Sequence, residues 1–133
     1  IRTRPAESYR YESFVGGKAM MGSFRRRTGK HKTTHEIVEE ARAGRRDAQF
    51  VIQEMRQYLA IGLANIVRAY DPEIIIIGGG LSGIPALTRG ITADVRPLLS
   101  ERLYTEVHIV TTSLRHTAGM LGGAALTMGP KPR

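Results

Sequence analysis

Three consecutive glycines, Gly78 to Gly80, follow a run of four isoleucines in the segment DPEIIIIGGGLSG (residues 71–83). Glycine has no Cβ, so a flat or charged ligand can approach the backbone amides of such a loop closely. Ser82 adds a hydroxyl group, and free N–H groups at the start of a following helix attract anions. The loop matches neither G-x-G-x-x-G in its usual register nor G-x-x-x-x-G-K-[ST], so a plain strand-to-helix turn and a ligand loop both remain open.

A second group of small residues lies in AGMLGGAAL (residues 118–126) and includes Gly122. Small side chains allow a helix to approach a sheet, another helix or a flat ring. Tight helix packing and a ligand-binding role are therefore both open for Gly122.

Residue types that catalyse reactions or bind metals are sparse. The sequence has no Cys, which excludes thiolate zinc sites and cysteine nucleophiles. His31 and His35 have the spacing of two ligands on one helix face, but no third ligand is evident, so a surface pair is favoured. The aspartates Asp47, Asp71 and Asp94 stand at expected helix ends, where capping explains them. We therefore predict no metal site and no catalytic residue in this chain.

The composition is that of one soluble globular domain, with 41% hydrophobic and 24% charged residues in 133. The sequence has neither a long apolar run nor the apolar stretch of a signal peptide, so we expect no membrane association. The absence of Cys favours a reducing compartment, and we expect a cytoplasmic protein. The first residue is Ile1 and not Met, which suggests a piece of a longer protein.

The formal net charge is +8, and much of it lies in FRRRTGKHK (residues 24–32) and ARAGRRD (residues 41–47). A basic balance permits binding of nucleic acids or of anionic ligands such as nucleotides. These segments contain neither a DNA-recognition helix nor the aromatic motif of an RNA-binding domain. We therefore expect a solvated basic surface, and a nucleic-acid-binding module is only the third candidate function.

The periodicity of apolar residues predicts an α/β layer structure with helices packed on a parallel strand pair. The longest helix, over residues 47–70, has a wide apolar face that should cover a sheet. The strand over residues 73–77 is apolar on both faces, which is typical of a strand with helices above and below. Before the longest helix we expect a coil (1–10), a helix over residues 11–27, and a second helix that begins at Thr33 or Thr34 and ends at Gly44. After the strand we expect short helical segments around Pro85 and Pro97 (84–103), a second strand (106–111), a helix (117–128) and a tail (129–133).

Two segments together resemble the C-terminal half of the ROK family, which groups bacterial sugar kinases with sugar-responsive transcriptional repressors. They are LANIVRAYDPEIIIIGGGLS (residues 63–82) and TSLRHTAGMLGGAAL (residues 112–126), and the resemblance covers about residues 11–128. It implies part of an actin-like ATPase (RNase H-like) lobe, with ATP and Mg²⁺ in the cleft between two lobes.

The resemblance also implies roles for individual residues. Gly78, Gly79 and Gly80 match the family's adenosine-side glycine loop, with Ser82 and Gly122 beside the nucleotide. The stretch YESFVGGKA (residues 11–19) resembles the family's E-x-x-x-S-G-x-A, whose Glu hydrogen-bonds sugar hydroxyl groups. Carboxylate–hydroxyl bonds of this kind are charge-assisted and strong. The expected sugar-site residues are therefore Glu12 and Gly17.

The chain also departs from the family pattern. The family's Cys-rich zinc motif before the Glu is missing, so we expect no zinc site. Compared with the pattern that the resemblance implies, Arg45 stands where the family has an Asp after Gly44, and Arg115-His116 stand where it has an acidic pair. Both changes add positive charge, and the second lies close to the expected nucleotide region. The family's catalytic Asp and its D-x-G-x-T phosphate loop come from the N-terminal lobe, and neither occurs here.

We therefore expect the C-terminal segment of an ATP-dependent sugar kinase, which would bind a hexose and an adenine nucleotide together with its missing N-terminal lobe. The segment alone should be inactive, and we expect the protein to form a homo-oligomer. The alternative is the sugar-effector-binding half of a ROK-type transcriptional repressor. A D-x-G-x-T motif upstream would favour the kinase, and a helix-turn-helix would favour the repressor.

Overall fold

The computed structural model describes residues 11–102, 107–114 and 117–127, without the side chains of Glu12, Leu81 and Ala118. The expected coil (1–10) and tail (129–133) lie outside this range. In chain order the elements are η2 (a 3-10 helix, Tyr11–Ser13), α1 (Gly17–Thr28), α2 (Thr34–Arg42), α3 (Arg46–Tyr70), β1 (Ile74–Ile77), α4 (Gly79–Ser82), α5 (Pro85–Thr88), α6 (Ile91–Val95), η3 (a 3-10 helix, Arg96–Leu98), β2 (His108–Thr111) and α8 (Ala118–Thr127).

Local sequence signals set the ends of the first helices. The single helix expected over residues 11–27 is wrong, because a break after η2 delays the start of α1 until Gly17. The residue at the break, Gly16, has a φ of 149°, a conformation that favours glycine. α2 begins with a capping box in which Thr33 and Glu36 each bond the other's backbone N–H group.

Helix α3 is the longest element, with 25 residues, and it contributes to two hydrophobic clusters. It ends at Asp71, which adopts a left-handed conformation (φ 46°) immediately before Pro72. The first cluster joins the N-terminal half of α3 to α1, α2 and α5, and its fully buried members include Met20, Ile37, Val51 and Leu87. The second cluster joins the C-terminal half of α3 to β1 and α6, and its members include Leu63, Ala64, Ile77 and Val95.

The two strands form a parallel pair in which Ile74 lies opposite His108 and Ile77 opposite Thr111. Helix α3 covers one face of this pair, as predicted, through Ile77 and the partly buried Ile75. The opposite face is open among the described residues: Ile74 and Ile76 are 53% and 61% exposed. The expectation of helices on both faces is therefore wrong within the described chain, although alternate residues of β1 are suited to burial on either side.

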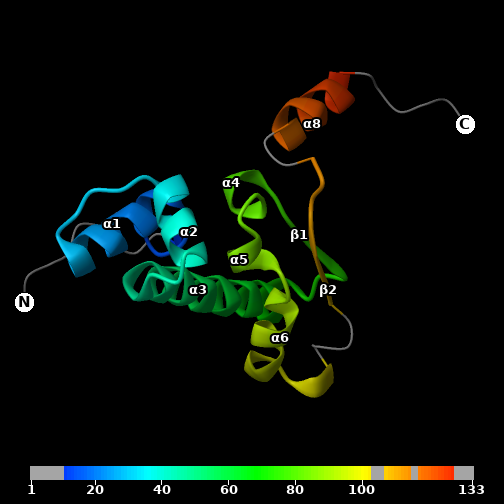
Figure 1. Cartoon of the computed structure of the whole chain (residues 1–133). Coiled ribbons are helices and arrows are strands. Elements are labelled where there is room, and N and C mark those ends of the chain that lie inside the picture. Colours follow the sequence, from blue (N-terminus) through cyan, green and yellow to red (C-terminus); the bar gives the residue numbers. More distant parts are fainter. Residues whose placement is uncertain (1–10, 103–106, 115–116, 128–133) are drawn as a thin grey trace, which may run out of the picture.

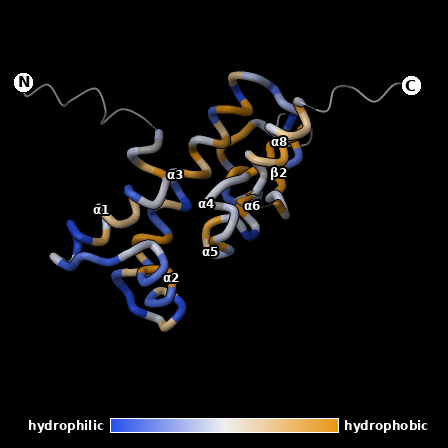
Figure 2. The backbone as a smooth tube through the Cα atoms, turned by 90° about the horizontal axis from the view of Figure 1, so that it is seen from above, coloured by the Kyte–Doolittle hydropathy of each residue, from blue (hydrophilic) through white to orange (hydrophobic). Residues whose placement is uncertain are grey.

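Helix α8 extends beyond the end of β2, on the same side as α4 (Figure 1). Its side chains are exposed wherever they are described, including Met120 at 72% and Leu126 at 86%. Figure 2 shows hydrophobic residues along α8 and β2, and hydrophilic residues concentrated around α1 and α2. Within the described ranges, no helix is both long and apolar enough to cross a membrane.

Candidate functional site

The glycine segment links the two hydrophobic clusters. Ile77, at the end of β1, is buried in the second cluster, and Ile84 is buried in the first. Between them, Gly78, Gly79 and Gly80 are exposed. Because a buried isoleucine fixes each end, this short exposed segment is held in place at the carboxyl end of the sheet. Ligands of open α/β sheets bind outside the carboxyl ends of the strands.

The glycines do not form the fully irregular loop that their composition suggests. Gly79 begins the single turn of α4, and its φ of +69° favours glycine. A Cβ built at Gly79 or Gly80 meets no atom within 4 Å, so a ligand has room to approach both residues. The Ser82 hydroxyl donates to the Gly79 carbonyl oxygen at 2.7 Å, so its proton is used inside the turn while its oxygen can still accept.

The end of β2 supplies hydroxyl groups that sequence reasoning missed. The Thr112 N–H group donates to the Ile77 carbonyl oxygen at 2.9 Å, which holds the ends of the two strands together. A Cβ at Gly78 would lie 3.5 Å from the Thr112 methyl group, so Thr112 lies directly beside the first glycine. Ser113 follows it. The signal was present in the sequence, since Thr112 and Ser113 directly follow the second expected strand and parallel strands end at one edge.

Gly122 lies on α8, which follows β2 at this same end of the sheet (Figure 1). A Cβ at Gly122 meets nothing within 4 Å, so tight packing against the described residues does not explain the glycine. Arg115 and His116, the positions that depart from the family pattern, lie outside the described residues.

The expected sugar-site residues lie in the first described segment of the chain, in η2 and at the start of α1. The backbone of Glu12 belongs to η2, and the structure does not describe its side chain. Gly17 is the first residue of α1, and a Cβ there would lie 3.2 Å from the Thr34 hydroxyl oxygen, so the space beside it at the start of α2 is tight. Glu12 and Gly17 therefore belong to the helical segments around α1, whereas the glycine segment follows β1.

Tyr11 attaches η2 to α3, a contact that sequence reasoning missed. Its hydroxyl group donates to the carbonyl oxygens of Tyr58 and Leu59, at 3.0 and 3.2 Å. Burial raises the pKa of the Tyr11 hydroxyl to about 12. The ring lies over Gly62, where an added Cβ would be 2.2 Å from it. Tyr11 therefore fixes the position of the neighbouring Glu12 backbone.

A cavity of about 430 Å³ lies next to this segment, between η2, α1 and α3. Its polar lining includes Arg26, Glu54 and Ser23, and the Ser23 hydroxyl donates to the Glu54 carboxylate. The rings of Phe14 and Tyr58, with centroids 5.3 Å apart, line the same cavity. Hydroxyl, carboxylate, guanidinium and aromatic groups together are suited to a hydroxyl-rich ligand.

Metal ligands do not gather in the part of the chain that the structure describes, where no three His, Cys, Asp or Glu residues form a group. His31 lies in the loop before α2 and His35 lies within α2, so the two do not share a helix.

Comparisons with known proteins and solved structures identify proteins that resemble this chain in sequence and in fold. A glucokinase from Pyrobaculum calidifontis is 37% identical over 73 residues, which are 54% of this chain and 25% of that protein. The crystal structure of a ROK family glucokinase from Streptomyces griseus, in complex with glucose and AMPPNP, superposes with a TM-score of 0.78. It is 22% identical, and the match covers 90% of this chain and 45% of that one.

A ROK family transcriptional regulator, a homologue of the E. coli MLC protein, superposes with a TM-score of 0.62 at 21% identity. That match covers 76% of this chain and 28% of the regulator, so this chain spans less than half of each of these proteins. The architecture is thus part of an actin-like ATPase fold. The family model of ROK proteins matches residues 10–129, nearly the whole chain. The chain therefore belongs to the ROK family.

Proposed function

We propose that this chain is the nucleotide-loop half of an ATP-dependent sugar kinase. The observation that carries the proposal is the exposed glycine segment, fixed at both ends and placed at the carboxyl end of a parallel strand pair, in a member of the ROK family. The glucokinases among the similar proteins, one of them with AMPPNP bound, support ATP as the phosphoryl donor.

The adenine nucleotide is assigned to Gly78, Gly79, Gly80, Ser82 and Gly122. The open space at the Cβ positions of Gly79, Gly80 and Gly122 fits a flat ring or a ribose against the backbone. The exposed backbone N–H and carbonyl groups would orient the nucleotide, and the Ser82 oxygen would accept one further hydrogen bond. Mg²⁺, when bound with ATP, neutralises charge on the phosphates, and we assign no residue of this chain to it.

The sugar is assigned to Glu12, with Gly17 close to it. A carboxylate accepts hydrogen bonds from two neighbouring hydroxyl groups and so selects a hydroxylated ring. Tyr11 holds η2 against α3 and thereby fixes the backbone from which Glu12 extends. The adjoining cavity with Glu54 and Ser23 provides further partners for hydroxyl groups.

The catalytic base and the D-x-G-x-T phosphate loop are assigned to another lobe, so this chain alone should not transfer phosphate. The exposed face of Ile74, Ile76 and Val110 is the surface that we expect the rest of the kinase to cover. We also propose that the complete protein is a homo-oligomer. A sugar-binding repressor half remains the alternative, supported by the fold similarity to a transcriptional regulator.

Titration calorimetry with AMPPNP on this chain tests the nucleotide assignment. We expect weak but measurable binding that is lost in Gly79→Val, because Val is strained at a φ of +69° and its side chain would occupy the space above the loop. Gly90→Val is the matched control, since Gly90 has a φ of +68° at the start of α6, away from the sheet end. Equal AMPPNP affinity in the wild type and in Gly79→Val would refute the assignment.

The second measurement separates the kinase from the repressor. The chain is mixed with the N-terminal half of a ROK kinase, and glucose phosphorylation is followed in the presence of ATP. Activity that appears only in the mixture, and that Glu12→Gln lowers through a higher KM for glucose, supports the kinase. Glucose binding to such a mixture with no phosphorylation would favour the repressor.

A further inference from the structure

A groove of about 510 Å³ lies at the opposite end of the molecule from the sheet, between the end of α1, the end of α2 and the start of α3. Three cationic side chains line it, namely Lys30, Arg45 and Arg46. All three are exposed to solvent, and among the described residues none of them forms an ion pair. Their charges are therefore free to act on a ligand.

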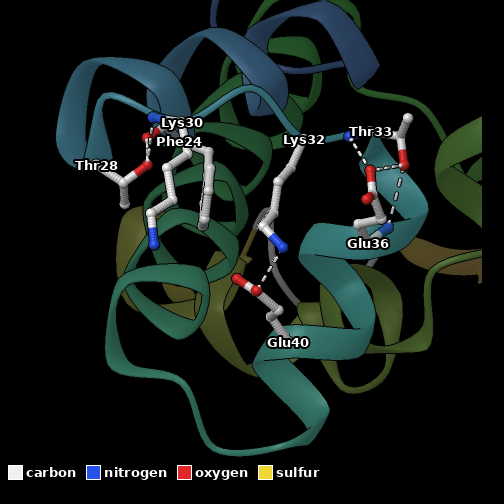
Figure 3. A network of polar contacts seen from close by, with 7 residues as sticks. All are labelled: Phe24, Thr28, Lys30, Lys32, Thr33, Glu36 and Glu40. Atoms are coloured by element: carbon white, nitrogen blue, oxygen red, sulfur yellow. Dashed lines mark hydrogen bonds and ion pairs between the residues drawn. The ribbon is translucent and has the colours of Figure 1, made fainter.

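The two carboxylates that line the same groove are already compensated by cations from outside its lining. Glu40 pairs with Lys32 at 2.6 Å, and Asp47 pairs with Arg27 at 2.7 Å. The Glu40 hydrogen bond is also the main cause that raises the pKa of Lys32. Figure 3 shows the Lys32 ammonium group directed at Glu40, with the Lys30 side chain on the Thr28 side of the groove. The groove thus carries three uncompensated positive charges.

Backbone hydrogen bonds fix the positions of the segments that carry these cations. The Lys30 N–H group donates to the Thr28 hydroxyl oxygen at 3.2 Å, and that hydroxyl group donates to the Phe24 carbonyl oxygen at 2.8 Å (Figure 3). Across the groove, the Arg45 N–H group donates to the Glu40 carbonyl oxygen at 2.9 Å. Cations carried on such a braced backbone lose less freedom on binding than cations on a loose loop.

We propose that this groove binds a phosphate-type oxyanion. Lysine binds phosphate oxygens as a point charge, and arginine binds them with paired N–H donors, so one Lys and two Arg match the chemistry of a multiply charged anion. The proposal does not depend on the kinase function, because the groove and the glycine segment share no residue.

Pyrophosphate is the probe, and calorimetry at low ionic strength is the measurement. The groove variant is Lys30→Gln, Arg45→Gln and Arg46→Gln combined. The control is Lys18→Gln, Arg25→Gln and Arg89→Gln, which removes the same charge from exposed cations outside the groove. We expect the groove variant to bind pyrophosphate at least about tenfold more weakly than the wild type, and the control to change affinity by less than about twofold.

Three further results decide the proposal. Chemical-shift changes of the Lys30, Arg45 and Arg46 amides on pyrophosphate addition would support it. Gly79→Val should bind pyrophosphate as the wild type does, which separates this site from the nucleotide loop. An equal loss of affinity in both triple variants would overturn it, because pyrophosphate would then be attracted by the overall positive charge of the protein and not by this groove. Binding of oligodeoxythymidylate without binding of pyrophosphate would overturn it in favour of a nucleic-acid surface.

Discussion

Replacement of Gly62 by alanine should destabilise the protein, although helix propensity predicts the opposite. Gly62 lies in the interior of α3, where alanine is favoured over glycine by about 1 kcal/mol. The three atoms nearest to an added Cβ are two ring carbons and the hydroxyl oxygen of Tyr11, at 2.2–2.3 Å. Gly62→Ala must therefore displace Tyr11 from α3.

The structure gives the size of this loss. Tyr11 is 45% exposed, so about half of its surface is buried against α3. Burial of about 100 Å² contributes ~2.5 kcal/mol, and the hydroxyl hydrogen bond adds ~1 kcal/mol. After the propensity gain of ~1 kcal/mol is subtracted, the free energy of unfolding should fall by ~2.5 kcal/mol.

A double-mutant cycle with Tyr11→Ala, measured by urea denaturation with circular dichroism, tests this explanation. Without the ring, Gly62→Ala should raise the free energy of unfolding by ~1 kcal/mol, because only the propensity term remains. The sign of the effect therefore reverses between the two backgrounds. A change of equal size and sign in both backgrounds would refute the explanation.

Three more predictions concern stability. Thr33→Ala should lower the free energy of unfolding by about 1 kcal/mol through loss of the capping box with Glu36, whereas Thr33→Ser should retain it; equal melting temperatures for the two variants would contradict this. Arg56→Lys should cost about 1–2 kcal/mol in urea denaturation, because one ammonium nitrogen does not replace the separate Nε and Nη1 donors that bond the Asp94 carboxylate and the Arg89 carbonyl oxygen; an unchanged midpoint argues against it. Since the pKa of Tyr11 is raised from 10.0 to about 12, the unfolded chain releases this proton first and stability should fall as pH rises through that window; Tyr11→Phe should show a smaller fall.

Features that depend on neighbouring residues were predictable from the sequence. The capping box of Thr33 and Glu36, the helix stop at Asp71-Pro72 and the helix start at Pro85 each involve residues within one turn. The parallel strand pair was also predictable, because helices separate two short apolar runs. The helix break at Gly16 was not, since apolar residues continue at helical spacing across it.

Features that depend on distant residues were not predictable. A run of isoleucines shows that β1 is suited to burial on both faces, but only other segments decide which faces are covered, and Ile74 and Ile76 are exposed. The contact of Tyr11 with Gly62 joins positions that no local pattern connects. In the candidate site, the position of Gly78 at the strand end was predicted, whereas its contact with Thr112 required the register of the two strands.

The division of the core along α3 determines how the chain can open. Each hydrophobic cluster supports about half of this helix, and a helix segment of ~12 residues is only marginally stable in water without packing. Loosening either cluster therefore removes the support of α3 beneath the other, so both should unfold as one cooperative unit in hydrogen exchange. The glycine segment is tied to one cluster at Ile77 and to the other at Ile84, so its position depends on that same shared unit.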